Sequence, residues 1–291
     1  MPRVHERTFR VRAAECDIHG VVRDANLLRY METAAYDASA AAGYDRARYL
    51  ALGRIWLIRE TLLDLHGELR LEEAVTVRTW VADFRRVRSR RAYELRHADT
   101  GALVATAVTD WAFLETATGR PAAIPPEMVA AFFPEGYADT PDPRPRFPSA
   151  EPPADAYTHR RRVEWRDLDS AGHVNNAAYL DYVEEAARRH LAACGWPTAR
   201  LVEAEVALAA HQHHIEYRQQ ALPDEELAVT TWLVSAAPET ALRHTVVRRQ
   251  ADGEVLAQAR TAWGCVHPLT RRRVPIPAAL LEALTAVQRV A

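Results

Sequence analysis

The chain contains the same sequence pattern twice. Shifting the sequence by 152 positions aligns the two halves without a gap, and pairs Asp17 with Asp169, Gly43 with Gly195 and Trp111 with Trp263. Ungapped agreement at Asp, Gly and Trp over such a span is not expected by chance. Two copies are too few for a stacked repeat protein, so we expect a pair of similar folded units.

Each copy has one long helical pattern followed by strand-like segments. The helices are expected at about 25–42 and 177–193, where apolar residues recur at helical spacing and a glycine follows as a C-terminal cap. Segments of alternating or β-branched character follow, for example 75–81 and 227–234. The sequence therefore predicts an α+β fold, in which each unit combines a long helix with an antiparallel sheet. Two such units can pair and protect their edge strands.

A proline-rich segment lies between the copies. Prolines cluster from Pro121 to Pro153, which is typical of a connection between domains. We predict an N-terminal unit at 1–125, a linker at 126–156 and a C-terminal unit at 157–291.

Composition excludes several classes of protein. The formal net charge is −2, so no overall field attracts nucleic acid or an anionic membrane. No apolar run approaches the roughly 20 residues of a membrane span, and no apolar secretory segment follows Met1. Only three cysteines occur, far apart, which disfavours a disulfide framework. We expect a cytoplasmic protein that binds neither nucleic acid nor a membrane.

The most specific motif is Asp167-Leu-Asp-Ser-Ala-Gly-His-Val-Asn-Asn-Ala-Ala-Tyr179, in the turn before the second long helix. Free N–H groups at a helix N-terminus can polarise a carbonyl, and a nearby carboxylate can activate water or attack the carbonyl. The alternative is a capped turn, in which Asn175 or Asn176 caps the helix. Spacing alone favours the capped turn.

This motif resembles the signature of hotdog-fold thioesterases of the 4-hydroxybenzoyl-CoA thioesterase type. The two-unit layout resembles the acyl-ACP thioesterase family, as do Trp56-Leu-Ile-Arg59, Val77-Arg-Thr-Trp80 and the segment 111–121. The resemblance implies two tandem hotdog units, paired as a pseudo-dimer, that hydrolyse an acyl thioester carried by acyl carrier protein or by CoA. We expect no metal and no cofactor. Five of the seven tryptophans are interpreted as core residues rather than acyl contacts, although a core residue beside an acyl tunnel can do both: Trp56, Trp80, Trp111, Trp232 and Trp263.

The resemblance assigns site residues. Asp169 corresponds to the catalytic carboxylate, with His173 and Asn175 orienting the water or the carboxylate, and Gly172, Val174 and Asn176 contacting the substrate. Asp17 is the equivalent in the first copy, where Val21 replaces His173, so we expect a weaker site there. Plant acyl-ACP enzymes carry an Asn where this chain has Ala171, and a Glu-Cys pair where it has Gln220 and Ala221. Gln220 is included as a substrate contact.

An arginine-rich segment, 85–91, has two interpretations. One is a solvated strand. The other is a docking patch, in which Arg86 and Arg88 bind a carrier's phosphate or acidic surface.

Two further functions stay open: a dehydratase or hydratase acting on a β-hydroxyacyl thioester, and a non-catalytic module that binds acyl thioesters. The chain is expected as a monomeric pseudo-dimer or as a homodimer.

Overall fold

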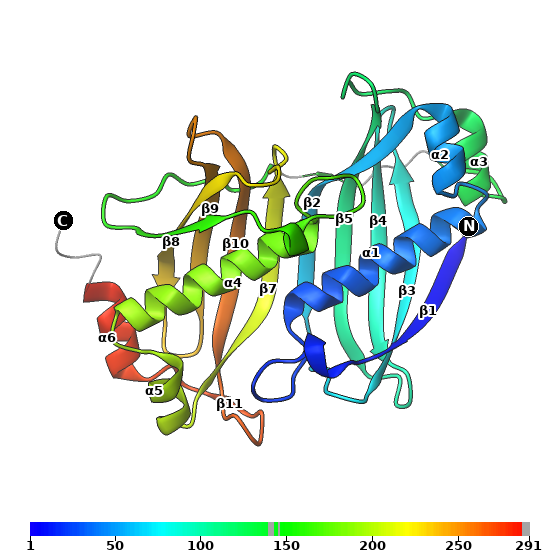
Figure 1. Cartoon of the computed structure of the whole chain (residues 1–291). Helices are drawn as coiled ribbons and strands as arrows, with labels where there is room; N and C mark the ends of the chain where they lie inside the picture. Colours follow the sequence, from blue (N-terminus) through cyan, green and yellow to red (C-terminus); the bar gives the residue numbers. More distant parts are fainter. Residues whose placement is uncertain (139–142, 145, 287–291) are drawn as a thin grey trace. The chain divides into compact units, whose positions relative to one another are not determined.

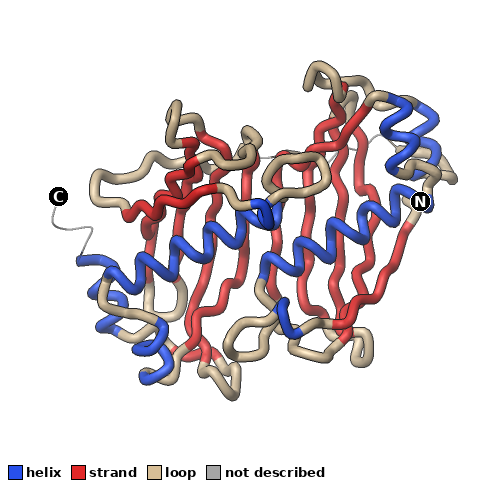
Figure 2. Tube along the Cα trace, viewed as in Figure 1, coloured by secondary structure: helices blue, strands red, loops and turns tan. Residues whose placement is uncertain are grey.

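The computed structural model describes residues 1–138, 143–144 and 146–286. The chain divides into two compact units, Met1–Arg146 and Phe147–Ala291. In each unit one long helix lies across one face of an antiparallel sheet (Figures 1 and 2). This confirms the predicted α+β class.

The N-terminal unit has a five-stranded sheet in the order β1-β3-β4-β5-β2. Its strands are β1 (Val4–Arg10), β2 (Arg54–Leu65), β3 (Ala74–Phe84), β4 (Arg88–His97) and β5 (Leu103–Glu115). The helix α1 (Asp24–Ala41) packs on β1 and β3. Its buried residues include Leu28, Met31, Ala35 and Ala38, which lie three or four positions apart and so share one face. The shorter elements are η1 (Ala13–Glu15), α2 (Arg46–Leu52) and α3 (Pro126–Phe132).

The C-terminal unit repeats this order. Its sheet has the order β7-β10-β9-β8-β6, with the short β11 (Arg273–Val274) paired to β10. The strands are β6 (Tyr157–Arg162), β7 (Ala207–Tyr217), β8 (Glu226–Ala236), β9 (Ala241–Arg249) and β10 (Val255–Val266). The helices are η2 (Trp165–Asp167), α4 (Asn176–Ala193), α5 (Thr198–Glu203) and α6 (Ala278–Ala286).

The 152-residue shift predicts the bounds of these elements closely. It carries α1 onto α4 and β3 onto β8 without an offset, and places the start of α3 on the start of α6. The prolines predict a linker at 126–156, but Pro126–Phe132 is a helix, and its Met128 and Phe132 are buried in the first unit. The contacts divide the chain between Arg146 and Phe147. Residues 139–142 and 145 of the predicted linker lie outside the described residues.

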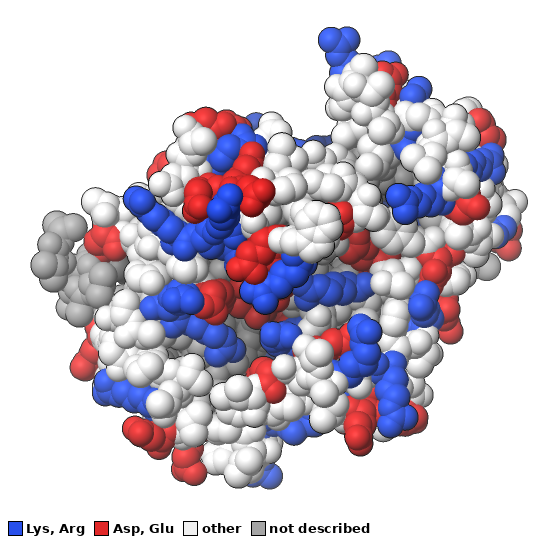
Figure 3. Space-filling model, viewed as in Figure 1, with Lys and Arg blue, Asp and Glu red and all other residues white. Residues whose placement is uncertain are grey.

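Successive side chains of a strand point to opposite faces of a sheet. In β3 the inward set includes Val75, Val77 and Val81, which are buried against α1 or the core beside it. Basic and acidic side chains are interspersed over the face shown in Figure 3. Among the described residues, no helix has the length and apolarity that crossing a bilayer requires.

Candidate functional site

The turn before α4 holds Asp169 in a fixed position. Its Oδ1 accepts a hydrogen bond from the Ala171 N–H at 2.8 Å, and the Asp169 N–H donates to the carbonyl of His173 at 2.9 Å. Gly172 closes the turn with φ +82°, a conformation that residues with a Cβ rarely adopt. The carboxylate is half-buried, with 21% of the side chain exposed, so it stays accessible to water or substrate.

His173 lies beside this carboxylate. Its Nδ1 is 3.4 Å from Asp169 Oδ2 and 3.4 Å from the carbonyl oxygen of Val174. The ring is buried, and among the described residues its Nε2 has no hydrogen-bond partner. Buried polar nitrogens are normally satisfied. The unsatisfied Nε2 is therefore a candidate contact for a bound water or substrate.

The first copy forms the same turn around Asp17. Asp17 Oδ1 accepts hydrogen bonds from the N–H groups of His19 at 2.8 Å and Val21 at 3.1 Å. The Asp17 N–H donates to the carbonyl of Val21 at 2.8 Å, and Gly20 has φ +72°. Val21 stands where the second turn has His173, so this turn presents a carboxylate without the adjacent imidazole.

The remaining residues of the second turn build the helix start. Asn175 is the N-cap of α4, and its side chain accepts from the Ala177 N–H at 2.9 Å. Val174 is buried, and its N–H donates to the carbonyl of Ala221 at 3.0 Å. The carbonyl of Asn176 accepts from the Tyr217 hydroxyl at 3.2 Å. The capping interpretation therefore holds for Asn175.

Some turn N–H groups are already used within the protein. Those of Gly172, Asn175 and Ala178 donate to backbone carbonyls. The N–H groups of His173 and Asn176 have no acceptor among the described residues. Free amides at a helix start stabilise developing negative charge. These two are the candidates for holding a carbonyl oxygen.

A buried carboxylate, Asp167, stabilises the turn through hydrogen bonds to the residues around it. It accepts hydrogen bonds from the Glu164 N–H at 2.9 Å and from Arg161 at 2.8 Å, and its backbone carbonyl accepts from the Asn175 N–H. In the capped-turn interpretation of the motif, its Asp residues stabilise the N-terminus of the helix. The burial of Asp167 shows that it supports the turn, whereas Asp169 is the more accessible carboxylate.

The other predicted contacts are exposed. Gln220 follows β7, and its carbonyl accepts from Arg249 at 3.1 Å. Arg86 lies in the hairpin between β3 and β4, and Arg88 is the first residue of β4. The arginine-rich segment is therefore a hairpin loop that leads into a strand, rather than one continuous strand.

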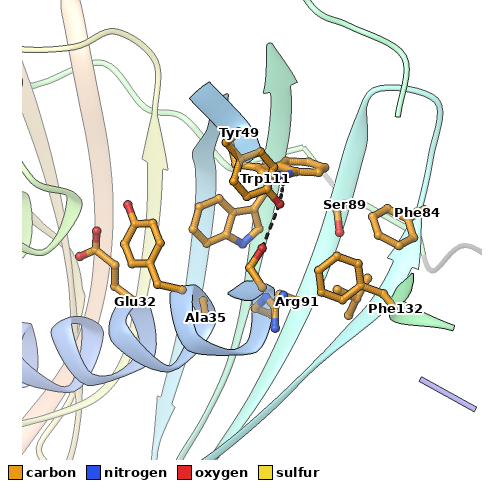
Figure 4. A pocket seen from close by; sticks show the side chains of 12 residues that line it. Glu32, Ala35, Tyr49, Phe84, Ser89, Arg91, Trp111 and Phe132 are labelled. Atoms are coloured by element: carbon orange, nitrogen blue, oxygen red, sulfur yellow. Dashed lines mark hydrogen bonds between the residues drawn. The ribbon is translucent and has the colours of Figure 1, made fainter. Parts of the chain in front are cut away.

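The N-terminal unit contains a pocket between α1 and the sheet (Figure 4). No motif in the sequence predicts it. The hollow encloses about 510 Å³, a volume that includes its open mouth. Its lining is mostly apolar and aromatic, and comes from α1, α2, α3 and strands β2 to β5. The lining residues are Glu32, Ala35, Tyr36, Ser39, Tyr49, Trp56, Val81, Phe84, Ser89, Arg91, Trp111 and Phe132.

Polar groups on one wall of the pocket are bonded to each other. The hydroxyls of Ser39 and Tyr49 are 2.9 Å apart, and the Trp56 indole donates to the Tyr49 hydroxyl at 3.1 Å. Burial raises the pKa of Tyr49. The buried Arg91 has a long 3.4 Å contact to Thr79 and lies 5.7 Å from the Phe132 ring centroid. Burial lowers the pKa of its guanidinium.

The C-terminal unit fills the equivalent space. The 152-residue shift carries Ser39, Tyr49 and Ser89 onto Leu191, Leu201 and Ala241, all of which are buried in one hydrophobic cluster with Trp263 and Leu284. Arg91 corresponds to Arg243, whose guanidinium donates to His190 Nδ1 at 2.8 Å. The signal in the sequence that could have located the pocket is that Ser39 and Tyr49 of the first repeat align with leucines of the second.

Sequence and structure comparisons agree with this architecture. The profile of the acyl-ACP thioesterase N-terminal domain matches residues 2–132, and that of the thioesterase-like superfamily matches residues 163–284. A Lactobacillus plantarum protein assigned as an oleoyl thioesterase superposes with a TM-score of 0.79 at 20% identity, covering 90% of this chain and 96% of that one. The fold is a tandem hotdog fold, with a long helix and an antiparallel sheet in each half. The chain belongs to the acyl-ACP thioesterase family.

Curated relatives are distant. The long-chain acyl-CoA thioesterase FadM of Escherichia coli is 28% identical over 126 residues, which are 42% of this chain and 92% of FadM. The chloroplastic acyl-carrier-protein hydrolase FATB2 of Cuphea viscosissima is 22% identical over 273 residues, which are 89% of this chain. The chain spans 62% of the length of that plant protein.

Proposed function

We propose that the chain hydrolyses acyl thioesters and that Asp169 is its catalytic carboxylate. The observation that carries the proposal is the pairing of Asp169 with His173, whose Nε2 is buried without a partner among the described residues. Such a nitrogen can hold a water molecule, and a carboxylate beside it can act as general base or nucleophile.

In the proposed reaction, Asp169 removes a proton from water, and the resulting hydroxide attacks the thioester carbonyl carbon. The N–H groups of His173 and Asn176 receive the oxygen as negative charge develops, an interaction worth about 3–4 kcal/mol per donor. The carbon–sulfur bond then breaks, and the proton passes to the thiolate. The products are a free acid and a thiol. Attack by the carboxylate itself, followed by hydrolysis of the anhydride, gives the same products.

We further propose that the pocket of the N-terminal unit takes the acyl group. An apolar, aromatic hollow suits a hydrocarbon chain. The equivalent space in the C-terminal unit is filled by leucines and other apolar side chains. On this view Trp56 and Trp111 contact the acyl group, although the sequence favoured a place in the core.

The carrier is proposed to be acyl carrier protein. The N-terminal profile and the plant relatives are named for acyl-carrier substrates, while FadM is named for acyl-CoA. Exposed Arg86 and Arg88 are proposed to contact an acidic carrier surface. A cytoplasmic location, predicted from the sequence, remains part of the proposal.

The test is thiol release from acyl-carrier and acyl-CoA thioesters by matched variants of the two turns. Asp169→Asn should lower kcat by about a thousand-fold, since it removes the base while preserving the turn. Asp17→Asn should retain activity within a few-fold. Full activity of Asp169→Asn would refute the assignment. Binding without thiol release by the wild-type chain would favour a non-catalytic module or a dehydratase.

A further inference from the structure

A row of charged side chains crosses the outer face of the N-terminal sheet. Asp83 on β3 lies opposite Arg90 on β4, and Arg90 lies opposite Asp110 on β5. Arg90 donates two hydrogen bonds to the Asp110 carboxylate, of 3.2 Å and 2.9 Å. Three residues from three neighbouring strands thus form one alternating line of charge.

Arg144, from the segment after α3, joins this line. Its Nε donates to Asp110 Oδ1 at 2.6 Å, and another guanidinium nitrogen donates to Asp83 Oδ1. The side chains of Arg144, Asp83 and Asp110 are only 6%, 3% and 7% exposed. Burial would raise the pKa of Asp110, but hydrogen bonds from Arg90 and Arg144 outweigh it and hold that pKa below its ordinary value. We call these four residues the Arg144 clasp.

The neighbouring row of the same strands faces the pocket. Phe84, Ser89 and Trp111 lie opposite one another across β3, β4 and β5, and all three line the pocket. Each immediately adjoins a clasp residue in the sequence. Because successive side chains alternate between faces, the clasp and this pocket wall are two sides of one three-strand segment.

The C-terminal unit makes the same strand pairings without charges. The equivalent outer row is Ser235, Leu242 and Ala262, paired in the same order across β8, β9 and β10. The sheet therefore forms without a clasp. The clasp and the pocket occur together in one unit, and their counterparts in the other unit are an uncharged row and a filled core.

We propose that Arg144 is a positioning residue that fixes the spacing of the pocket wall and thereby sets which acyl groups the pocket accepts. The proposal rests on the proposed acyl-binding role of the pocket. A buried guanidinium that joins carboxylates on two strands resists their separation, because pulling either away leaves an uncompensated buried charge. A wall held in this way cannot widen to admit a longer or branched chain.

The test combines hydrolysis with direct binding. The uncharged variant Asp83→Ser/Arg90→Leu/Asp110→Ala, with Arg144→Gln, copies the row of the C-terminal unit and leaves no orphan charge. Arg144→Lys is the conservative variant, and Arg78→Gln, in an exposed ion-pair cluster on β3, is the matched control. Each is assayed for kcat and KM across acyl chain lengths, and for Kd with a fluorescent long-chain fatty acid.

For the uncharged variant we expect kcat on the shortest thioester to stay within about two-fold, while the ratio of long-chain to short-chain kcat/KM changes by about ten-fold, the worth of one methylene in a fitted pocket. Arg144→Lys should show a ratio between those of the wild-type chain and the uncharged variant. Arg78→Gln should keep the wild-type ratio. An unchanged ratio and probe Kd in a folded uncharged variant would overturn the proposal. If the wild-type chain hydrolysed nothing, the proposed function would fail, and the probe Kd alone would still decide the role of the clasp.

Discussion

The two halves of the chain have the same elements at a constant spacing, yet they use the space beneath the long helix differently. In the N-terminal unit this space is a pocket lined by serine, tyrosine, tryptophan and arginine. In the C-terminal unit leucines and an alanine from the same positions fill it. The difference shows that a repeat can keep its backbone while a handful of side chains decide whether the interior is a packed core or an open pocket.

The buried arginines sharpen the comparison. Arg91 and Arg243 occupy the same strand position, and each contacts an equivalent threonine, Thr79 or Thr231. Arg243 also donates to His190 Nδ1, whereas α1 has Ala38 at the matching position. The C-terminal unit thus supplies an internal partner for its arginine, and the N-terminal unit leaves its arginine facing the pocket.

Filling the pocket should have the largest effect. The pair Ser39→Leu and Tyr49→Leu gives the N-terminal unit the residues of the C-terminal one. We expect kcat/KM on long acyl thioesters to fall about a hundred-fold, with little change on the shortest one. The added leucines reduce the volume of the pocket, and only long acyl chains occupy that volume. Steady-state kinetics across chain lengths measures this. Ala40→Leu, at an exposed position of the same helix, should leave the profile unchanged; equal losses at all lengths would contradict the pocket's role.

The second prediction concerns pH. Burial and the charge of Arg243 lower the pKa of His190 from 6.5 to about 4. Between these values the unfolded chain binds a proton that the folded chain does not, so stability falls on acidification. We expect His190 to account for about 2 kcal/mol of the loss in unfolding free energy between pH 7 and pH 5. Urea unfolding of His190→Ala should show a shallower pH dependence, whereas Ala40→Leu, which removes no titratable group, should keep the wild-type slope.

The smallest effect should come from the helix starts. Asn175 caps α4 through its side chain, while Arg23 at the start of α1 makes no such bond. Asn175→Ala should therefore cost about 1 kcal/mol of stability, and Arg23→Ala a few tenths. Thermal unfolding of the two variants measures the difference. Equal costs would mean that the caps are not what distinguishes the two turns.

Much of the architecture could be predicted from the sequence. A gapless repeat, one helical pattern per copy and a glycine after each helix were enough for two α+β units, because periodicity and capping are local properties of the chain. The Asp169 turn was equally visible, since its Gly172, its cap Asn175 and its carboxylate lie within seven consecutive residues. Its catalytic role remains a proposal.

Tertiary structure alone decided the rest. The pocket gathers side chains from three helices and four strands, and no short motif encodes such a set. The Arg144 clasp joins residues 61 and 34 positions apart, and only strand pairing brings Asp83, Arg90 and Asp110 into one row. Likewise Asp167 and Asp169 are two residues apart, yet only the fold buries one as a brace and leaves the other accessible, because burial depends on what packs against a residue rather than on its neighbours in sequence.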